Sequence, residues 1–321
     1  MLVSVIIPTL DRPKLLLRAI DSVLRQTHHD IEIIIVVDRP SPETLAAVRT
    51  ITDSRLRLIL NPHPTTAAGA RNVGADCAVG EWIAFLDDDD EWLPNKLEQQ
   101  LAFAAGRPPA LLSCLSRVMT PYAIFVSPQV IFDNSTPVDE YLFDRCSLSA
   151  GWGGIQSSSF LLPRKLFEKV RFNIDSPHDD WEFVLRLSKQ AGARIETVPE
   201  VLVVNYFEEA RPSLTARSSS WVTSLRWIEG MRPILTRRAY SGFCLGAVGS
   251  RAAREGAYKA FPYLLHKAFR NGSPGPRQIL PFLAYWFTPL EIQRQLRRVF
   301  HRRPRPNSFN KMPGETGRVG T

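Results

Sequence analysis

Short apolar runs rich in β-branched residues alternate with segments of helical spacing along the first hundred residues of the chain. Residues 3–7 form one such run, and residues 31–37 form a second that is apolar on both faces. Between them, apolar side chains recur every three or four residues from Leu16 to Leu24, with Asp11 as the candidate N-cap of the helix. This pattern predicts a strand, a helix and a buried parallel strand.

The same rhythm continues for most of the chain. It predicts further helices over residues 42–52, 66–78, 93–105 and 180–191, and further strands over residues 56–60, 82–86, 157–162 and 195–204. Such alternation is typical of an α/β fold in which helices cover both faces of a mostly parallel sheet. Ligands of these folds bind beyond the carboxyl ends of the strands, so the loops that follow the first four strands should share one rim.

The net charge of +8 is divided unevenly along the chain. Residues 1–220 hold 22 Lys and Arg against 28 Asp and Glu, whereas residues 221–321 hold 18 against 4. The basic C-terminal arm also carries Trp221, Trp227 and Trp286, and aromatic rings beside cationic helix faces suit the surface of an anionic membrane. The alternative is a helical appendage whose aromatic side chains pack on the acidic body. Nucleic acid would also suit the charge, but it is not the partner that we expect.

The cysteines and the apolar segments indicate the cellular compartment of the protein. Four cysteines, at positions 77, 114, 146 and 244, have neither zinc-ribbon nor disulfide-framework spacing, so a reducing compartment fits best. The N-terminus has no basic region before its apolar run, which indicates a strand and not a signal peptide. The longest apolar stretch, residues 279–287, is about half of the ~20 residues that a spanning helix needs. We therefore expect a cytoplasmic protein with peripheral contact to the inner face of the cell membrane.

The strongest single motif is Asp87-Asp88-Asp89-Asp90-Glu91, a run of acidic residues directly after an apolar strand. Carboxylates crowded at a strand end repel one another, and a hard divalent cation relieves this repulsion. Mg²⁺ or Mn²⁺ needs only one or two protein carboxylates and takes phosphate oxygens as further ligands. The alternative interpretation is a solvated acidic turn or the first turn of a helix.

Beside this motif, several other polar residues are candidates for binding a nucleotide or for catalysis. Asp38 follows the second predicted strand, where a carboxylate can accept a hydrogen bond from a base or a ribose, although an ordinary turn aspartate would look the same. Arg71 lies on a helix of small residues that can pack close to the sheet and present its guanidinium to phosphate, or it is a surface arginine. Asp179 and Asp180 stand at a helix start, where acids cap the helix by default and where one of them can also serve as a general base.

In chain order, these features resemble the inverting family 2 glycosyltransferases with the GT-A fold. The matching segments are Ser4-Val5-Ile6-Ile7-Pro8-Thr9, the strand that ends in Asp38, Gly69-x-Arg71-Asn72-x-Gly74, Gly80-Glu81-Trp82-Ile83-Ala84-Phe85-Leu86-Asp87-x-Asp89-Asp90, and Asp179-Asp180 followed by Arg186. The resemblance extends from the first residues to about residue 215, and the ordered set is far more specific than any one motif.

The resemblance implies a metal-dependent transfer of a sugar from a nucleotide-sugar, with UDP favoured, to a hydroxyl of a saccharide or lipid-linked acceptor in cell-surface or exopolysaccharide synthesis. It assigns Pro8, Thr9, Asp11, Asp38, Arg71, Asp87 and Asp88 to the nucleotide-sugar, Asp89 with Asp87 to Mn²⁺ or Mg²⁺, Asp180 with Asp179 as its alternate to the catalytic base, and Trp152, Gly153 and Gly154 to the acceptor side. Two positions depart from the family pattern. Arg39-Pro40 stands where the family often has Gly, and Asp179 stands where it usually has Glu, so the choice between the two carboxylates stays open.

We therefore expect a GT-A domain over residues 1–215, a basic helical extension over 216–303 and a disordered tail over 304–321. Two other functions match parts of the sequence. A sugar-nucleotide pyrophosphorylase would also use acids and a metal, but it needs a glycine-rich phosphate loop after the first strand, and residues 8–12 contain no glycine. A non-enzymatic protein could bind nucleic acid or membrane through the basic arm alone.

Overall fold

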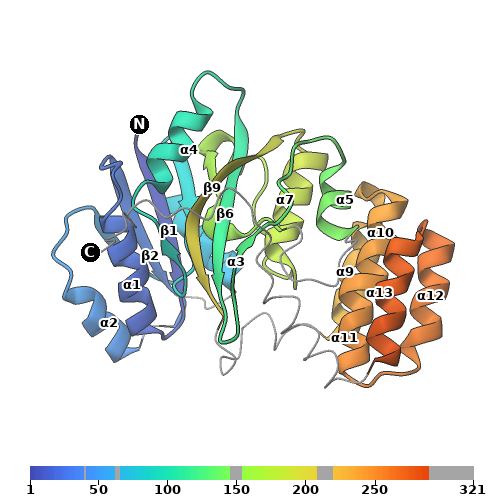
Figure 1. The fold of residues 1–321 in the computed structure, drawn as a ribbon. Helices are drawn as coiled ribbons and strands as arrows, with labels where there is room; N and C mark the ends of the chain where they lie inside the picture. The colour runs from blue at the N-terminus through green and yellow to red at the C-terminus, as the bar shows by residue number, and fades with distance from the viewer. Residues whose placement is uncertain (40, 62–65, 145–153, 208–219, 289–321) are drawn as a thin grey trace, which may run out of the picture.

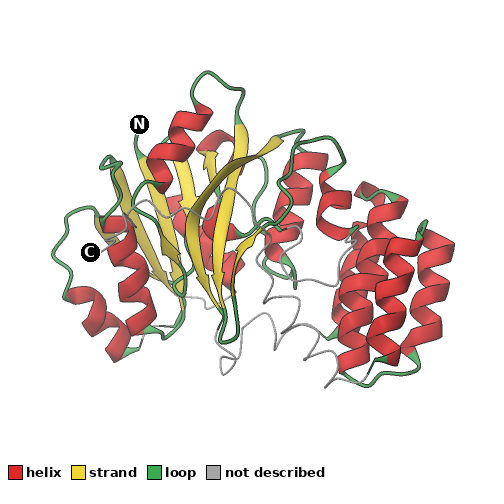
Figure 2. Ribbon diagram, viewed as in Figure 1, coloured by secondary structure: helices red, strands yellow, loops and turns green. Residues whose placement is uncertain are grey.

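The fold is a mixed sheet covered by helices on both faces, with a group of C-terminal helices beside one end of it (Figure 1). The computed structural model describes residues 1–39, 41–61, 66–144, 154–207 and 220–288. Figure 2 shows the strands as one continuous curved layer, which is the layer that the alternating apolar runs predict.

Nine strands form the sheet in the described part of the chain, in the order β3-β2-β1-β4-β8-β6-β9-β5, with β7 paired to β6. The strands are β1 (Val3–Thr9), β2 (Ile31–Val37), β3 (Leu56–Leu60), β4 (Trp82–Phe85), β5 (Glu91–Trp92), β6 (Ala110–Met119), β7 (Ile124–Ser127), β8 (Leu161–Pro163) and β9 (Arg194–Tyr206). The first four run parallel, as do β6 and β9, whereas β5, β7 and β8 are antiparallel to their neighbours. The predicted parallel part is therefore confirmed, and three strands of opposite direction make the sheet mixed.

Among the described helices, five follow the predicted ranges, five lie within the expected C-terminal helical extension, and the short helices over residues 138–143 and 164–167 were not predicted. The helices are α1 (Pro13–Leu24), α2 (Pro42–Arg49), α3 (Ala67–Cys77), α4 (Lys96–Ala104), α5 (Val138–Phe143), α6 (Arg164–Phe167), α7 (Asp179–Lys189), α9 (Trp221–Met231), α10 (Arg237–Phe243), α11 (Gly249–Arg254), α12 (Ala260–Asn271) and α13 (Pro276–Phe287), with 3₁₀ turns η1 (Ser157–Ser159) and η2 (Arg232–Ile234) and a π turn η3 (Cys244–Val248). Within the described residues, each helix is too short or too polar to span a bilayer.

Two hydrophobic cores lie on the two faces of the sheet, because successive residues of a strand point to opposite sides. Val5 and Ile7 of β1 are fully buried in one core together with Leu16 of α1. Ile6 is fully buried in the other core, which also contains Phe183 of α7. One short strand thus anchors both layers of helices.

The C-terminal helices share the second core. Trp227 of α9 is 9% exposed and lies in the same cluster as Phe183, and its indole N–H donates to Glu182 Oε2 of α7 at 2.7 Å. For Trp227, the interpretation that the aromatic side chains of the basic arm pack on the body is confirmed. The arginines beyond residue 288 and the predicted disordered tail lie outside the described residues.

Asp11 does not cap α1, so that prediction is wrong. Its backbone has a left-handed φ of 47°, and its carboxylate accepts a hydrogen bond from the Ser41 hydroxyl. Arg12 is the N-cap residue instead, and it makes no capping hydrogen bond with its side chain. The loop between β1 and α1 is therefore held at the start of α2 through Asp11, and this contact does not involve the side chain of Arg12.

Two predicted boundaries are also wrong, one because a side chain competes with backbone pairing and the other because a short strand pairs where a helix was expected. Residues 157–159 form the turn η1, in which the Ser159 hydroxyl donates to the Gln156 carbonyl at 2.7 Å, and the strand begins only at Leu161. Glu91 and Trp92 pair with β9 as a short strand, so α4 begins at Lys96 and not near residue 93.

Gly74 sets how closely α3 approaches the sheet. A Cβ atom at this position would lie 2.5 Å from Ile6 Cγ2 and 3.1 Å from Val36 Cγ2, both on buried strands. The absence of a side chain therefore lets α3 lie directly on β1 and β2, as the small-residue segment predicts. This contact brings Arg71, one turn earlier on α3, to the rim of the sheet.

Gly74→Ala should destabilise the protein by about 1–3 kcal/mol, because the added methyl group overpacks a filled core. The measurement is the free energy of unfolding from chemical denaturation. Gly230→Ala is the matched control: it is also helical, but its Cβ position has no heavy atom within 4 Å. The control should leave stability unchanged or raise it by up to about 1 kcal/mol. Equal effects of the two variants would contradict the close contact.

Candidate active site

The loops after the first parallel strands meet at one rim, as the sequence predicts. The Thr9 hydroxyl at the end of β1 donates to Asp88 Oδ2 at 2.6 Å. The Asp38 backbone N–H, just past β2, donates to the Thr9 carbonyl at 3.0 Å. Asn61, just past β3, donates from its side chain to Asp38 Oδ1 at 2.7 Å and was not recognised from the sequence.

The four consecutive aspartates have different surroundings. Asp90 is buried and accepts hydrogen bonds from Ser158 Oγ at 2.6 Å and Asn205 Nδ2 at 2.7 Å, and its burial raises its pKa well above the usual range. Burial also raises the pKa of Asp88 to about 7, against the opposing charge of Arg12. The side chains of Asp87 and Asp89 are 30% and 31% exposed. Of the four, these two therefore present carboxylate oxygens toward solvent.

Arg12 bridges two members of the acid run, which sequence reasoning missed. Its Nε donates to Asp88 Oδ2 at 3.1 Å, and its Nη2 pairs with Asp88 Oδ1. Its Nη1 donates to Asp89 Oδ2 at 3.0 Å. The available signal was the position of Arg12 in the loop after β1, which belongs to the same rim as the acid run.

Arg71 joins the acid run to the acid pair. Its side chain is 4% exposed, and its guanidinium donates to Asp87 Oδ1 at 2.6 Å, Asp179 Oδ2 at 2.7 Å and Ser157 Oγ at 2.9 Å. Although burial opposes it, the charges of the surrounding carboxylates raise the pKa of Arg71. A permanent buried cation thus holds together the three loops that carry these acceptors.

Asp180 lies in this network with one oxygen that accepts no hydrogen bond from the described residues. Its Oδ2 accepts a hydrogen bond from the Ser157 backbone N–H at 3.0 Å. Its Oδ1 is buried, lies 3.7 Å from Arg71 Nη1 and has no hydrogen-bond partner among the described residues. Burial raises the pKa of Asp180 to about 7, against Arg71 and reinforced by Asp179. A buried carboxylate oxygen without a donor is costly and is typical of a group that exchanges a proton.

The two acids do not cap the helix that they begin, so the capping interpretation is wrong for their side chains. The N-cap residue of α7 is His178, and it makes no capping hydrogen bond with its side chain. The carboxylates of Asp179 and Asp180 turn toward Arg71 and Ser157 instead. The strong local field of the buried guanidinium outweighs the weaker attraction of the helix N-terminus.

The serine turn η1 supports both halves of the network and was predicted only as part of a strand. The Ser157 hydroxyl donates to Asp87 Oδ2 at 3.2 Å, and the Asp87 backbone N–H donates to Ser158 Oγ at 3.1 Å. Trp92 Nε1 and Gln100 Nε2 hold the turn from behind by donating to the carbonyls of Ser158 and Ser159 at 2.8 and 2.9 Å. Three consecutive hydroxyl residues before an apolar strand were the signal for this turn.

His178 connects the acid pair to the C-terminal helices. Its ring stacks on Trp181, with 5.1 Å between the centroids, and its Nε2 lies 3.0 Å from Ser224 Oγ of α9. Burial, with a smaller effect of Arg251, lowers the pKa of His178 to about 4. The imidazole is therefore neutral near pH 7 and acts as a packing element that positions the start of α7.

The remaining predicted residues lie around this network or outside the described part. Pro8 belongs to β1 and pairs with Val36, on the same edge as Thr9. Gly154 begins a described segment, and the nearest heavy atom to its Cβ position is Ser127 Oγ at 4.0 Å. Trp152 and Gly153, predicted for the acceptor side, lie outside the described residues.

The acid run does not form a ready cage for a metal ion. In the described segments, no three Asp, Glu, His or Cys side chains converge on one point. The aspartates instead spread onto Arg71, Thr9 and Arg12, so two guanidinium groups relieve part of the predicted repulsion. The donor set still fits a hard cation, because Asp87 and Asp89 offer partly exposed oxygens and Mg²⁺ or Mn²⁺ keeps most of its ligands from phosphate and water.

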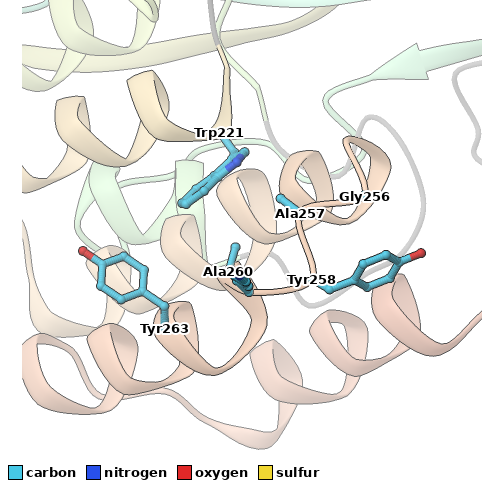
Figure 3. Close-up of a pocket in the computed structure, with 7 residues that line it drawn as sticks. Trp221, Gly256, Ala257, Tyr258, Ala260 and Tyr263 are labelled. Carbon is cyan, nitrogen blue, oxygen red and sulfur yellow. The ribbon is translucent and has the colours of Figure 1, made fainter.

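A separate hollow of about 540 Å³ lies on the C-terminal helices, where the start of α9 meets the start of α12 (Figure 3). It is lined by Trp221, Gly256, Ala257, Tyr258, Lys259, Ala260 and Tyr263. None of the predicted site residues lines it. The hollow is therefore distinct from the acid network at the rim of the sheet.

Comparison with known proteins agrees with the fold and the motifs. The family model described as glycosyl transferase family 2 matches residues 4–171, slightly more than half of the chain. The chain is 29% identical over 246 residues to the amylovoran biosynthesis glycosyltransferase AmsB of Erwinia amylovora, in an alignment that covers 73% of this chain and 79% of AmsB.

Two further comparisons cover less sequence or only the fold. The chain is 42% identical over 101 residues to the UDP-Glc:alpha-D-GlcNAc-diphosphoundecaprenol beta-1,3-glucosyltransferase WfgD of Escherichia coli, which covers 32% of this chain and 40% of WfgD. The solved structure of the mannosyltransferase PcManGT from Pyrobaculum calidifontis, in complex with GDP-Man and Mn²⁺, aligns with a TM-score of 0.56 at 19% identity, over 93% of this chain and 84% of PcManGT. These likenesses confirm the predicted GT-A fold class.

Proposed function

The chain belongs to glycosyl transferase family 2 and is a glycosyltransferase, and from this premise we propose that it moves a sugar from a nucleotide-sugar to an acceptor hydroxyl by an inverting displacement. The observation that carries the proposal is the single network in which Arg71 joins Asp87 of the acid run to Asp179, next to Asp180. The guanidinium of Arg71 thus links the carboxylates proposed to bind the donor to those proposed to accept the proton. An in-line displacement needs both groups at the same reacting centre.

In this mechanism Asp180 is the catalytic base. Its Oδ1 takes the proton of the acceptor hydroxyl while the acceptor oxygen attacks the anomeric carbon, and the bond from that carbon to the diphosphate breaks. The Ser157 N–H holds the other oxygen, Oδ2, and Arg71 Nη1 lies 3.7 Å from Oδ1, so the two contacts together orient the carboxylate. A pKa near 7 suits a base that must accept a proton at neutral pH and release it afterwards.

The nucleotide pocket is proposed at the edge of β1 and β2. Asp38 is buried and held by Asn61, so its carboxylate is fixed where a base or ribose would donate a hydrogen bond. Pro8 and Thr9 at the end of β1 and Asp11 in the following loop are proposed to line the same pocket, with Asp88, which accepts a hydrogen bond from Thr9, turned toward the ribose. UDP is the favoured nucleotide because the name of WfgD specifies UDP-Glc, whereas PcManGT was solved with GDP-Man.

Asp89, with Asp87, would hold the divalent cation. When bound, Mn²⁺ or Mg²⁺ would neutralise the charge that develops on the departing diphosphate. The two residues lie at the carboxyl end of β4, at the rim shared with Asp38. The structure of PcManGT with Mn²⁺ supports this assignment by analogy of fold alone.

The acceptor is proposed to be a saccharide, free or linked to a lipid diphosphate, in cell-surface or exopolysaccharide synthesis. The names of AmsB and WfgD refer to amylovoran biosynthesis and to a diphosphoundecaprenol-linked sugar. The alignment covers only 40% of the length of WfgD, so the activity of this chain is inferred from its site and not from the name of WfgD alone. Residues 152–154 are proposed to lie on the acceptor side.

A lipid-linked acceptor agrees with peripheral membrane contact through the C-terminal helices, and we propose residues 216–303 as the extension that makes it and residues 1–215 as the catalytic domain. On α12 and α13, which lie side by side at the outer edge of the molecule (Figure 1), Phe269, Leu280 and Phe287 are 58%, 66% and 72% exposed. Arg270 and Arg277 are exposed on the same helices. Exposed apolar side chains beside arginines are the composition that enters an anionic lipid surface.

A donor screen tests the proposed function most directly. With Mn²⁺ present, the protein should release nucleoside diphosphate from one of the UDP-, GDP- or dTDP-sugars, and release should stop when EDTA removes the cation. The readout is a coupled assay for each nucleoside diphosphate. No release from any of the three donor classes, with saccharide and lipid-linked acceptors supplied, would contradict the proposal.

Asp180→Asn should lower turnover by at least about 10²-fold, because an amide cannot accept the acceptor proton, while nucleotide affinity changes little. The kcat/KM of the native protein should rise with pH through about 7, where Asp180 loses its proton, and this dependence should be missing from the residual activity of the variant. Asp179→Asn is the comparator, since it also removes a carboxylate from Arg71. A larger loss for Asp179→Asn would transfer the role of base to Asp179.

The membrane proposal predicts flotation with vesicles that contain phosphatidylglycerol and not with pure phosphatidylcholine, and loss of flotation at high salt. The double variant Phe269→Ser/Leu280→Ser should reduce the bound fraction several-fold, because burial of apolar side chains contributes to the affinity. Ile124→Ser is the control, since Ile124 is 61% exposed but lies on β7 of the sheet. Equal flotation of the three proteins would exclude α12 and α13 as the contact.

A further inference from the structure

Arg12 and Arg71 both donate hydrogen bonds to aspartates of the acid run, but they are held in place to different degrees. Arg71 is 4% exposed, lies on the regular helix α3 and is fixed by three acceptors, so it is a permanent part of the framework. Arg12 is 32% exposed and stands in the loop between β1 and α1, next to Asp11 with its left-handed φ. Of these two arginines, Arg12 can therefore leave its acceptors without unfolding an element.

The acceptors of Arg12 include the carboxylate that would hold the cation. Its Nη1 donates to Asp89 Oδ2 at 3.0 Å, while its Nε and Nη2 engage Asp88. A guanidinium within hydrogen-bond distance of Asp89 and a divalent cation on the same carboxylate would repel each other strongly at this separation. The Arg12 ion pair and a cation on Asp89 therefore oppose each other in the arrangement that the structure describes.

We propose that Arg12 is a displaceable internal counter-ion, which holds Asp88 and Asp89 in the donor-free protein and moves onto the diphosphate of the donor when the cation binds Asp89. This inference rests on the proposed nucleotide-sugar transfer. The diphosphate supplies the acceptors that Arg12 loses, because arginine makes charge-assisted, often bidentate hydrogen bonds to phosphate as well as to carboxylate. Arg12 is thus a positioning residue that couples the binding of the cation to the binding of the nucleotide.

The coupling has a measurable consequence in the absence of turnover. A cation that binds alone must break the Arg12 ion pairs without replacement, whereas a cation that binds with a nucleoside diphosphate provides new partners for the guanidinium. The native protein should therefore bind Mn²⁺ weakly alone and more tightly with UDP. By thermodynamic reciprocity, Mn²⁺ should raise the affinity for UDP by the same factor, and factors of about 5–150 are usual for coupled sites.

The test is a set of Mn²⁺ titrations followed by electron paramagnetic resonance of free Mn²⁺, with and without UDP. Arg12→Met should tighten binding of Mn²⁺ alone by about 10-fold and should reduce the enhancement by UDP to the part that comes from direct ligation of Mn²⁺ by the diphosphate. Arg12→Lys keeps the charge but loses the planar fork, so it should recover part of the enhancement. Thermal unfolding of each variant establishes that it is folded at the temperature of the titration.

Arg18→Met is the matched control for the loss of a nearby charge. The Arg18 guanidinium donates to the backbone carbonyl of Asp89 at 2.5 Å and lies 3.9 Å from the centroid of the Tyr206 ring, but no described contact joins it to a carboxylate of Asp87 to Asp90. Its removal subtracts the same charge and frees Glu91 and the main-chain carbonyl of Asp89, but no carboxylate oxygen of Asp89. It should therefore change Mn²⁺ affinity much less than Arg12→Met does and should leave the enhancement by UDP intact.

Two outcomes would overturn the proposal for Arg12 alone, and a third would also overturn the assignment of the metal site. If Arg12→Met binds Mn²⁺ no more tightly than the native protein, or if Arg18→Met has the same effect, Arg12 is not a displaceable counter-ion. Either result leaves the transferase proposal standing as long as the native protein binds Mn²⁺ and UDP together. If the native protein binds no Mn²⁺ even with UDP, GDP or dTDP, the metal assignment fails and the Arg12 proposal fails with it.

Discussion

The buried guanidinium of Arg71 is the interaction on which the site depends. It binds Asp87 after β4, Ser157 in η1 and Asp179 at the start of α7, the last of these 108 residues away in the chain. Removing one partner of a buried ion pair typically costs about 3–5 kcal/mol, because the other charge is left uncompensated. The same group sets the environment of Asp180. Both the arrangement of these segments and the environment of the proposed base therefore depend on the Arg71 guanidinium.

The position of that cation follows from packing rather than from charge. Arg71 reaches the rim because α3 lies directly on the sheet, and α3 lies there because Gly74 has no side chain to hold it away from Ile6 and Val36. A core residue that makes no contact in the site thus determines the depth at which the guanidinium enters it. This dependence links the small-residue pattern of the helix to the geometry of the carboxylates.

The sequence predicted the first four strands, β9 and the helices between the first strands well, because their apolar periodicity is strong and their connections are short, but it did not predict β6, the parallel partner of β9. The meeting of the carboxyl ends of parallel strands also placed Asp38 and Asp87 to Asp89 in one region, whereas Arg71 and Asp180 were assigned to it by the family resemblance. The sequence did not predict Arg12 or Ser157 as partners, because their roles depend on which side chains face each other across loops. The short strands β5 and β8 were missed or misplaced because two or three residues carry no periodic signal.

The aromatic packing around His178 has a consequence for how proteins of this kind can be recombined. Beside the imidazole, Phe143 contacts Trp181, Trp227 and Phe243 edge to face, with ring centroids 4.9 to 6.2 Å apart. These rings come from both sides of residue 215, and Trp181 is the neighbour of Asp180 in the chain. A chimera that grafts the first 215 residues onto a foreign C-terminal half would have to refit this cluster before α7 could take its place. The two halves of the chain are therefore expected to evolve together rather than as exchangeable modules.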